Sequence, residues 1–250
     1  MGVGFGTARR WTPSPRSTPT CSSCASTATR RRCRTSRCRA FAEQEGSYLV
    51  GAAAALKSKS NHIGFIGGNE SALITKFYAG YVQGAKAVKN DIKVDDKRLA
   101  TGDDGAGFGN IDGAKVAAQA MYGNGADIIY TAAGGSFNGS FPVAASTGNL
   151  AIGVDSDQYE TVGDPKPQKI ILTSMIKRVD NAVYLSIKSF KDTGKASGTA
   201  YGLKDEGVGY STSGGKVDDI KSKPGRLPPA DHRRQDQGVR DRRRRDRPLT

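Results

Sequence analysis

The stretch "ADIIYTAAGG", residues 126–135, decides the fold. It is a short apolar run closed by two glycines, and such a run is typical of a strand buried on both faces. Two further stretches have a similar form, "HIGFIGG" at 62–68 and "LAIGVDSDQ" at 150–158. We therefore expect a sheet whose strands run through the interior of the protein.

The segments between these strands have helical periodicity. In residues 71–91 the apolar side chains recur at steps of three and four and share one helical face: Ile74, Phe77, Tyr81, Ala85 and Val88. Helices are also predicted at 41–59, 110–125, 140–148 and 178–194 (capped by Gly194), and strands at 98–103 and 169–175. This alternation indicates an open α/β fold with a mainly parallel sheet.

The formal net charge of +14 belongs to the two ends of the chain. Residues 1–40 contain nine Arg and no acidic residue, and residues 224–250 contain nine Arg against four Asp. The segment 41–223 is neutral, with twenty basic and twenty acidic residues. We therefore expect a folded core at 41–223 between two arginine-rich ends that are disordered, or that are truncated or frame-shifted readings of a longer gene.

Four cysteines lie in the first of these ends, and Cys21 and Cys24 form a C-x-x-C pair. Two residues separate Cys21 from Cys24, eight separate Cys24 from Cys33, and four separate Cys33 from Cys38. This spacing matches no familiar zinc module. His62 and His232 have no second histidine at ligand spacing. We expect neither a metal site nor a cofactor.

The sequence also bears on location in the cell. No apolar run reaches the roughly 18–20 residues that span a bilayer. As written, the chain has no apolar signal segment and no lipoprotein cleavage pattern before a cysteine. We expect it to lack a signal peptide and a lipobox.

Small and polar residues follow the predicted strands, where ligands bind in open α/β sheets. The positions are Gly67-Gly68-Asn69, Gly105 to Asn110, Gly134-Gly135 and Asp155-Ser156-Asp157. Glycine after a strand also permits a simple tight turn. The glycine patterns do not complete a dinucleotide-binding motif.

Several segments resemble one known family: "FAEQEGSYLVGAAAALKSK", "GFIGG", "KFYAGYVQGAKAV", "NGADIIYTAAGG", "AIGVDSDQ" and "LTSMIKRVDNAVY". In this order they are similar to the basic membrane protein (BMP) family, the purine-nucleoside-receptor-like substrate-binding lipoproteins of ABC transporters. The resemblance covers 41–223 and implies a type I periplasmic-binding-protein fold, with two Rossmann-like α/β lobes and, in this chain, an incomplete first lobe.

The resemblance also implies a binding site for a nucleoside-like small molecule between the lobes. Phe108 matches the position whose ring stacks on the nucleobase, and Gly134 matches a close backbone approach. Asp155 matches the carboxylate that holds the ribose hydroxyls, and Lys177 matches the lysine that completes the sugar site. The chemistry fits, because a carboxylate accepts from two vicinal hydroxyls and an aromatic face stacks on any base.

Structural alternatives exist for these residues. Asp157 is equally suited to forming a turn, and Lys177 to pairing with Asp155 or Asp180 at the surface. An aromatic such as Phe108 packs in a core by default, but its flanking glycines favour a ring exposed on a loop.

The resulting hypothesis is an extracytoplasmic, lipid-anchored receptor that delivers its ligand to an ABC permease and breaks no bond. A nucleoside-acting α/β enzyme is an alternative, although no acid/base pair of recognisable spacing is present. Non-specific nucleic-acid binding through the arginine-rich ends, as in "RDRRRRDR" at 240–247, is another. With an incomplete first lobe, we expect exposed apolar surface and weak or absent ligand binding.

Overall fold

The computed structural model describes residues 41–102, 105–194 and 200–221. The two arginine-rich ends, the four cysteines and His232 therefore lie outside the described residues. Along the chain the elements are α1 (Glu43–Lys57), β1 (His62–Asn69), α2 (Ala72–Val88), β2 (Lys93–Ala100), η1 (Ala106–Phe108), α3 (Ile111–Gly123), β3 (Ile128–Ala132), η2 (Gly134–Ser136), α4 (Phe137–Thr147), β4 (Leu150–Asp155), α5 (Gln158–Thr161), α6 (Pro165–Gln168), β5 (Ile171–Lys177), α7 (Val179–Thr193), β6 (Val208–Tyr210) and α8 (Asp218–Lys221).

The strands of the described residues form a six-stranded sheet in the order β2-β1-β3-β4-β5-β6. The pairs from β2 to β5 are parallel, and β6 runs antiparallel to β5. The expectation of an α/β fold with a mainly parallel sheet is confirmed. The chain moves from β1 outward to β2 and then back past β1 to β3, so the strand order reverses between β1 and β3. Ligand crevices of open α/β sheets lie at the carboxyl ends of the strands beside such a reversal.

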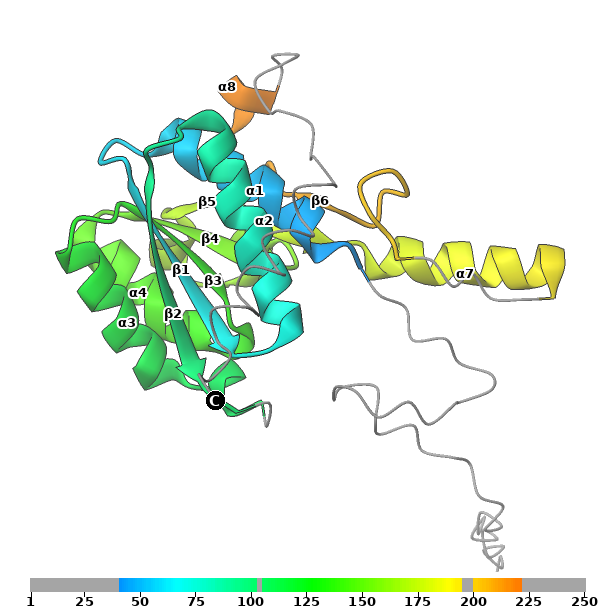
Figure 1. Cartoon of the computed structure of the whole chain (residues 1–250), viewed down its shortest axis with the longest axis horizontal. Helices are drawn as coiled ribbons and strands as arrows, with labels where there is room; N and C mark the ends of the chain where they lie inside the picture. The colour runs from blue at the N-terminus through cyan, green and yellow to red at the C-terminus, as the bar shows by residue number, and fades with distance from the viewer. Residues whose placement is uncertain (1–40, 103–104, 195–199, 222–250) are drawn as a thin grey trace, which may run out of the picture. The chain divides into compact units, whose positions relative to one another are not determined.

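Helices cover both faces of this sheet (Figure 1). On the side of α1 and α2, the buried core includes Phe65, Tyr81 and Tyr130. On the side of α3 and α4, a second buried cluster includes Ile129 and Phe141. Because the sheet is covered on both faces, its central strand β3 is apolar along its length, as "ADIIYTAAGG" indicated.

Helices α1 and α2 approach to backbone contact. A Cβ built at Gly51 overlaps the carbonyl oxygen of Tyr81, and one built at Gly84 overlaps that of Tyr48. Gly80 meets the backbone of α1 in the same way. These positions have no space for any larger residue, which fixes the separation of α1 and α2.

Several elements differ from the sequence prediction, among them β2, α4 and β6. Strand β2 begins at Lys93, five residues before the predicted start, because this edge strand is charged and lacks an apolar run. Helix α4 begins at Phe137 rather than Ser140, with Pro142 in its interior instead of its first turn. Strand β6 has only three residues and was not predicted.

Helix α7 ends as predicted, with Gly194 in the left-handed conformation at φ 68°. It contacts the rest of the fold through Ser186, whose hydroxyl lies 2.8 Å from that of Tyr201. Large apolar side chains of the helix are exposed, namely Val179, Val183, Tyr184, Ile187 and Phe190. The exposed apolar surface expected from the sequence is therefore present, and it is concentrated on α7.

Candidate functional site

The four residues implied by the resemblance all follow the carboxyl ends of strands. Asp155 is the last residue of β4, and Lys177 is the last residue of β5. Phe108 ends η1, which follows β2, and Gly134 begins η2, which follows β3. Since these strands are parallel, the sheet brings all four residues to one edge.

Asp155 and Lys177 form an ion pair at this edge. The Lys177 Nζ lies 3.1 Å from Asp155 Oδ1, and the two side chains are 18% and 55% exposed. Asp155 stands opposite Ile176 in the register of the sheet, which places Lys177 one step further on. Of the two surface partners considered for Lys177, the structure selects Asp155, because Asp180 pairs with Arg178 at 2.9 Å.

Asp155 has an unusual backbone conformation. Its φ is +68°, in the left-handed region that a non-glycine residue adopts only at a cost. Asp is among the residues that tolerate this region best. The conformation ends β4 and presents a half-exposed carboxylate at the carboxyl edge, and strained residues of this kind cluster at functional sites.

The Lys177 ammonium has two further neighbours. It lies 5.0 Å from the ring centroid of Phe77, a distance at which a cation is attracted to the face of the ring. It also lies 3.9 Å from Glu43 Oε1. Two carboxylates and an aromatic face thus surround the Lys177 ammonium and hold it in place.

Phe108 lies between Gly68, near the end of β1, and Gly134, which follows β3. A Cβ built at Gly68 falls 2.6 Å from the Phe108 ring, and one at Gly134 falls 3.1 Å from the Phe108 carbonyl oxygen. Gly134 also has a positive φ of 51°. The close approach inferred for Gly134 is therefore, in this structure, an approach to Phe108 itself.

The ring of Phe108 is partly buried and packs against the cluster on the α1–α2 side. The sequence left open whether Phe108 packs in the core or is exposed on a loop. The structure combines the two, because the side chain packs against the core and is only partly buried. A hydrogen bond of 2.8 Å from the Ser136 hydroxyl to the Gly107 carbonyl ties η2 to η1. The stacking candidate is therefore held by neighbouring backbone.

Asp157 is a turn former, the structural alternative that the sequence left open. Its side chain caps α5 by accepting from the backbone N–H of Tyr159. Its Oδ2 also accepts hydrogen bonds of 2.6 Å from the hydroxyls of Ser211 and Ser213. These contacts connect β4 to the segment after β6.

Sequence reasoning missed Glu43 and Phe77 as neighbours of Lys177. Phe77 was assigned only to the buried face of its helix, which it also occupies. Glu43 is 5% exposed at the first position of α1. Burial raises the pKa of its carboxyl, an effect opposed by its own backbone N–H and by Lys177. An acidic residue in the first turn of a helix is so common that its sequence position alone carries no signal.

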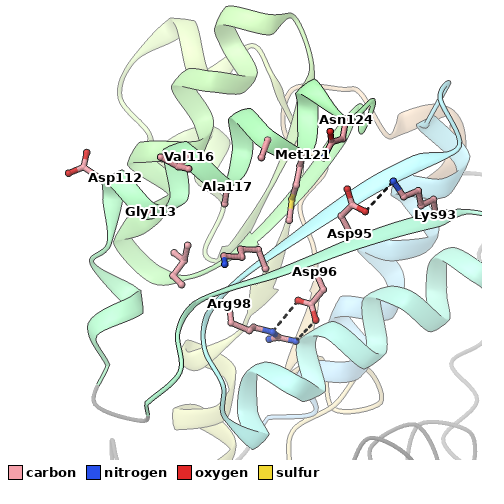
Figure 2. Close-up of a pocket in the computed structure, with 13 residues that line it drawn as sticks. Lys93, Asp95, Asp96, Arg98, Asp112, Gly113, Val116, Ala117, Met121 and Asn124 are labelled. Atoms are coloured by element: carbon pink, nitrogen blue, oxygen red, sulfur yellow. Dashed lines mark hydrogen bonds and ion pairs between the residues drawn. The ribbon is translucent and has the colours of Figure 1, made fainter. Parts of the chain in front are cut away.

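A separate groove of about 790 Å³ runs between β2 and α3 (Figure 2). Its apolar floor includes Ala117 and Met121, and its rim carries Lys93 and Asp95, which pair at 3.5 Å. None of Phe108, Gly134, Asp155 and Lys177 lines it. Since the four residues implied by the resemblance lie outside this groove, we place the candidate site at the carboxyl edge of the sheet.

Two features are absent from the described residues. They contain no group of three or more His, Cys, Asp or Glu residues placed to hold a metal ion. Within the same ranges, every helix is too short or too polar to cross a membrane.

Solved structures with the same architecture are solute-binding proteins and their structural relatives. A solute-binding protein of an ABC transporter system from Aeropyrum pernix K1 matches 82% of this chain and 58% of its own, with a TM-score of 0.54 and 24% identity. A transcriptional activator of the comK gene from Bacillus halodurans matches 81% of this chain and 62% of its own, with a TM-score of 0.57 and 21% identity. At these identities the likeness shows the fold, which is the type I fold of periplasmic solute-binding proteins.

Sequence comparison identifies the family. Residues 36–224 match the family model described as ABC transporter substrate-binding protein PnrA-like. The ABC transporter nucleoside-binding protein BmpA of Lactococcus lactis subsp. cremoris is 43% identical over 183 residues, which cover 67% of this chain and 50% of BmpA. Basic membrane protein D of Borreliella burgdorferi is 35% identical over 174 residues, 68% of this chain and 48% of that protein.

The chain belongs to the Bmp family of PnrA-like ABC transporter substrate-binding proteins. The resemblance stated from the sequence is thereby confirmed. The chain spans about half the length of the curated relatives it matches.

Proposed function

We propose that this chain supplies the ligand-binding edge of a solute-binding protein that captures a nucleoside-like small molecule for an ABC permease. The Asp155–Lys177 pair, which lies at the same carboxyl edge of the sheet as Phe108, carries the proposal. The printed name of the Lactococcus relative, a nucleoside-binding protein, supports the ligand class.

Each residue has a role in this proposal. The Asp155 carboxylate accepts from two vicinal hydroxyls, since an ionised carboxylate has several acceptor positions and no donor. Lys177 donates to a sugar oxygen and partly neutralises Asp155. The solvent-facing part of the Phe108 ring stacks on the base, and the backbone at Gly134 keeps that ring in place.

The role involves binding and release, with no bond broken. Affinity arises when a second surface closes over the ligand, because only contacts that differ between the open and closed states drive closure. The chain spans about half the length of its curated relatives, so we expect the isolated chain to bind weakly. We also infer an extracytoplasmic position beside the permease, as the family description implies.

The test is a titration of the isotope-labelled 250-residue chain with adenosine, guanosine, cytidine and free ribose, followed by amide chemical shifts in NMR spectra. Chemical shifts detect binding even in the millimolar range. We expect shifts at Phe108, Gly134, Asp155 and Lys177, larger for nucleosides than for ribose. Shifts confined to the β2–α3 groove, or no shifts with any nucleoside, would overturn the proposal.

The competing enzymatic function is tested in the same samples. Chromatography after prolonged incubation detects free base released from a nucleoside. Catalytic release of base that Asp155→Asn abolishes would replace the binding proposal with a hydrolase.

A further inference from the structure

Glu43 is buried at the candidate site, although it begins a helix. It is the first residue of α1, and its side chain is 7% exposed. The first turn of a helix normally directs an acidic side chain to water, where the helix dipole favours its charge. Here the carboxyl group lies under the end of β5 instead, 3.9 Å from the Lys177 ammonium.

The two oxygens of this carboxyl group differ. Oε1 faces Lys177, whereas Oε2 is buried and has no hydrogen-bond partner among the described residues. Buried polar atoms in folded proteins are nearly always hydrogen-bonded, because an unmet acceptor loses its hydration without compensation. An acceptor that stays unmet beside a candidate binding site is open to a donor from outside the chain.

Glu45 provides an internal comparison. It has the same side chain, lies on the same helical turn and is also largely buried. Its Oε2 accepts a hydrogen bond of 2.8 Å from the backbone N–H of Leu203. Glu45 thus connects α1 to the segment before β6, a structural task that Glu43 does not share.

We propose that Glu43 is a specificity-determining ligand contact of this site. Its Oε2 accepts a hydrogen bond from an O–H or N–H group of the nucleoside, while Asp155 receives the vicinal hydroxyls. The inference rests on the proposed function, because it assigns a further contact to the same site. Lys177, placed between the two carboxylates at 3.1 Å and 3.9 Å, offsets their charge.

The arrangement also explains why an acceptor stands at this position. A site that presents a buried acceptor rejects a ligand that lacks the matching donor, because the acceptor then stays unpaired in the complex. Glu43 accordingly discriminates between nucleosides that differ by a single donor group. The nucleoside without that donor binds more weakly, because it leaves Oε2 unpaired in the complex.

The experiment compares Glu43→Gln with Glu45→Gln in the full 250-residue chain. Each variant is titrated by NMR with adenosine, with its 2′-, 3′- and 5′-deoxy analogues, and with purine riboside, which lacks the amino group. For wild type we expect weaker binding of the one analogue that lacks the donor to Glu43. Glu43→Gln should weaken adenosine binding by about tenfold and leave that analogue unaffected. Glu45→Gln should leave every affinity unchanged.

Thermal unfolding separates this role from a structural one. Because Oε2 of Glu43 has no partner among the described residues, the Tm of Glu43→Gln should equal that of wild type or exceed it, whereas Glu45→Gln should lower the Tm. If Glu43→Gln does not weaken the binding of the 5′-deoxy analogue, the donor to Glu43 is a sugar hydroxyl. If it does not weaken the binding of purine riboside, the donor is the amino group of the base.

Two results would overturn the assignment of Glu43. One is an equal loss of affinity for adenosine and all analogues, and the other is unchanged affinity of Glu43→Gln for adenosine. If wild type binds no nucleoside at all, the proposed function fails first and the assignment fails with it.

Discussion

The ammonium nitrogen of Lys177 lies 3.1 Å from Asp155 Oδ1, across the ends of two neighbouring parallel strands. Replacing Lys177 by Met keeps the length of the side chain and removes its charge. We expect nucleoside affinity to fall about tenfold or more, since a hydrogen bond to a charged group contributes about 1.5–3 kcal/mol. NMR titration measures the change. Lys166→Met, at an exposed position in α6, is the matched control and should bind as wild type does.

The contact between α1 and α2 predicts a severe effect of Gly84→Ala. The added methyl group overlaps the carbonyl oxygen of Tyr48, so the two helices must separate. We expect a loss of about 3 kcal/mol or more in the free energy of unfolding, at the upper end of the range for overpacked cores. Urea unfolding provides the value.

A matched glycine serves as the control for that substitution. Gly123 ends α3, and a Cβ built there meets no atom within 4 Å. Gly123→Ala should leave stability unchanged or raise it by up to about 1 kcal/mol, because alanine favours the helix. Equal losses for Gly84→Ala and Gly123→Ala would contradict the close contact.

The buried carboxyl of Glu43 predicts a pH dependence of stability. Burial raises its pKa; Lys177 and Lys76 lower it, and Asp155 adds to the rise. The folded state therefore binds this proton more tightly than the unfolded state does. The stabilisation from this bound proton is complete below the pKa of Glu in the unfolded state, about 4.3. It is lost as pH rises through the pKa of Glu43 in the folded state.

Urea unfolding of wild type and Glu43→Gln at several pH values tests this dependence. The difference between the two isolates Glu43 from the other acidic groups. Wild type should lose stability relative to Glu43→Gln as pH rises above the ordinary pKa of a Glu carboxyl, because the raised pKa of Glu43 makes its ionisation costly in the folded state. A difference that is constant across these pH values, or of opposite sign, would count against an elevated pKa.

The exposed apolar face of α7 predicts self-association. Tyr184, Ile187 and Phe190 are each at least 60% exposed, and contiguous exposed apolar surface favours association. Replacing Ile187 and Phe190 together by Ser should lower the apparent mass measured by light scattering at high protein concentration. Lys188→Ser on the same helix should not lower it. An unchanged apparent mass in the double variant would exclude α7 as the cause.

The sequence predicts the interior of this fold better than its edges. The strand at 126–135 and the buried helical face at Ile74, Phe77 and Tyr81 follow from apolar periodicity, which burial enforces. Strand β2 is the exposed edge of the sheet and is charged to discourage pairing with other chains, so its pattern contains no apolar alternation. Strand β6 is too short for periodicity to register.

The candidate site shows a similar division. Phe108, Gly134, Asp155 and Lys177 are placed together by the parallel order of the strands, which the sequence predicts. Glu43 is added by the way α1 packs beneath β5, and that packing depends on glycines whose partners are distant in sequence. No local pattern distinguishes Glu43 from Glu45, although one has an unmet oxygen and the other a backbone partner.

The glycine contacts between α1 and α2 also determine what can vary in this protein. They are contacts of backbone with backbone, so the separation of α1 from α2 does not depend on which large side chains surround the two helices. Substitutions among aliphatic core residues can therefore change the melting temperature while the spacing of the two helices is kept. A larger residue at Gly51, Gly80 or Gly84 forces the helices apart and moves Glu43 together with α1. The placement of Glu43 is thus open to change through small residues that lie between the two helices.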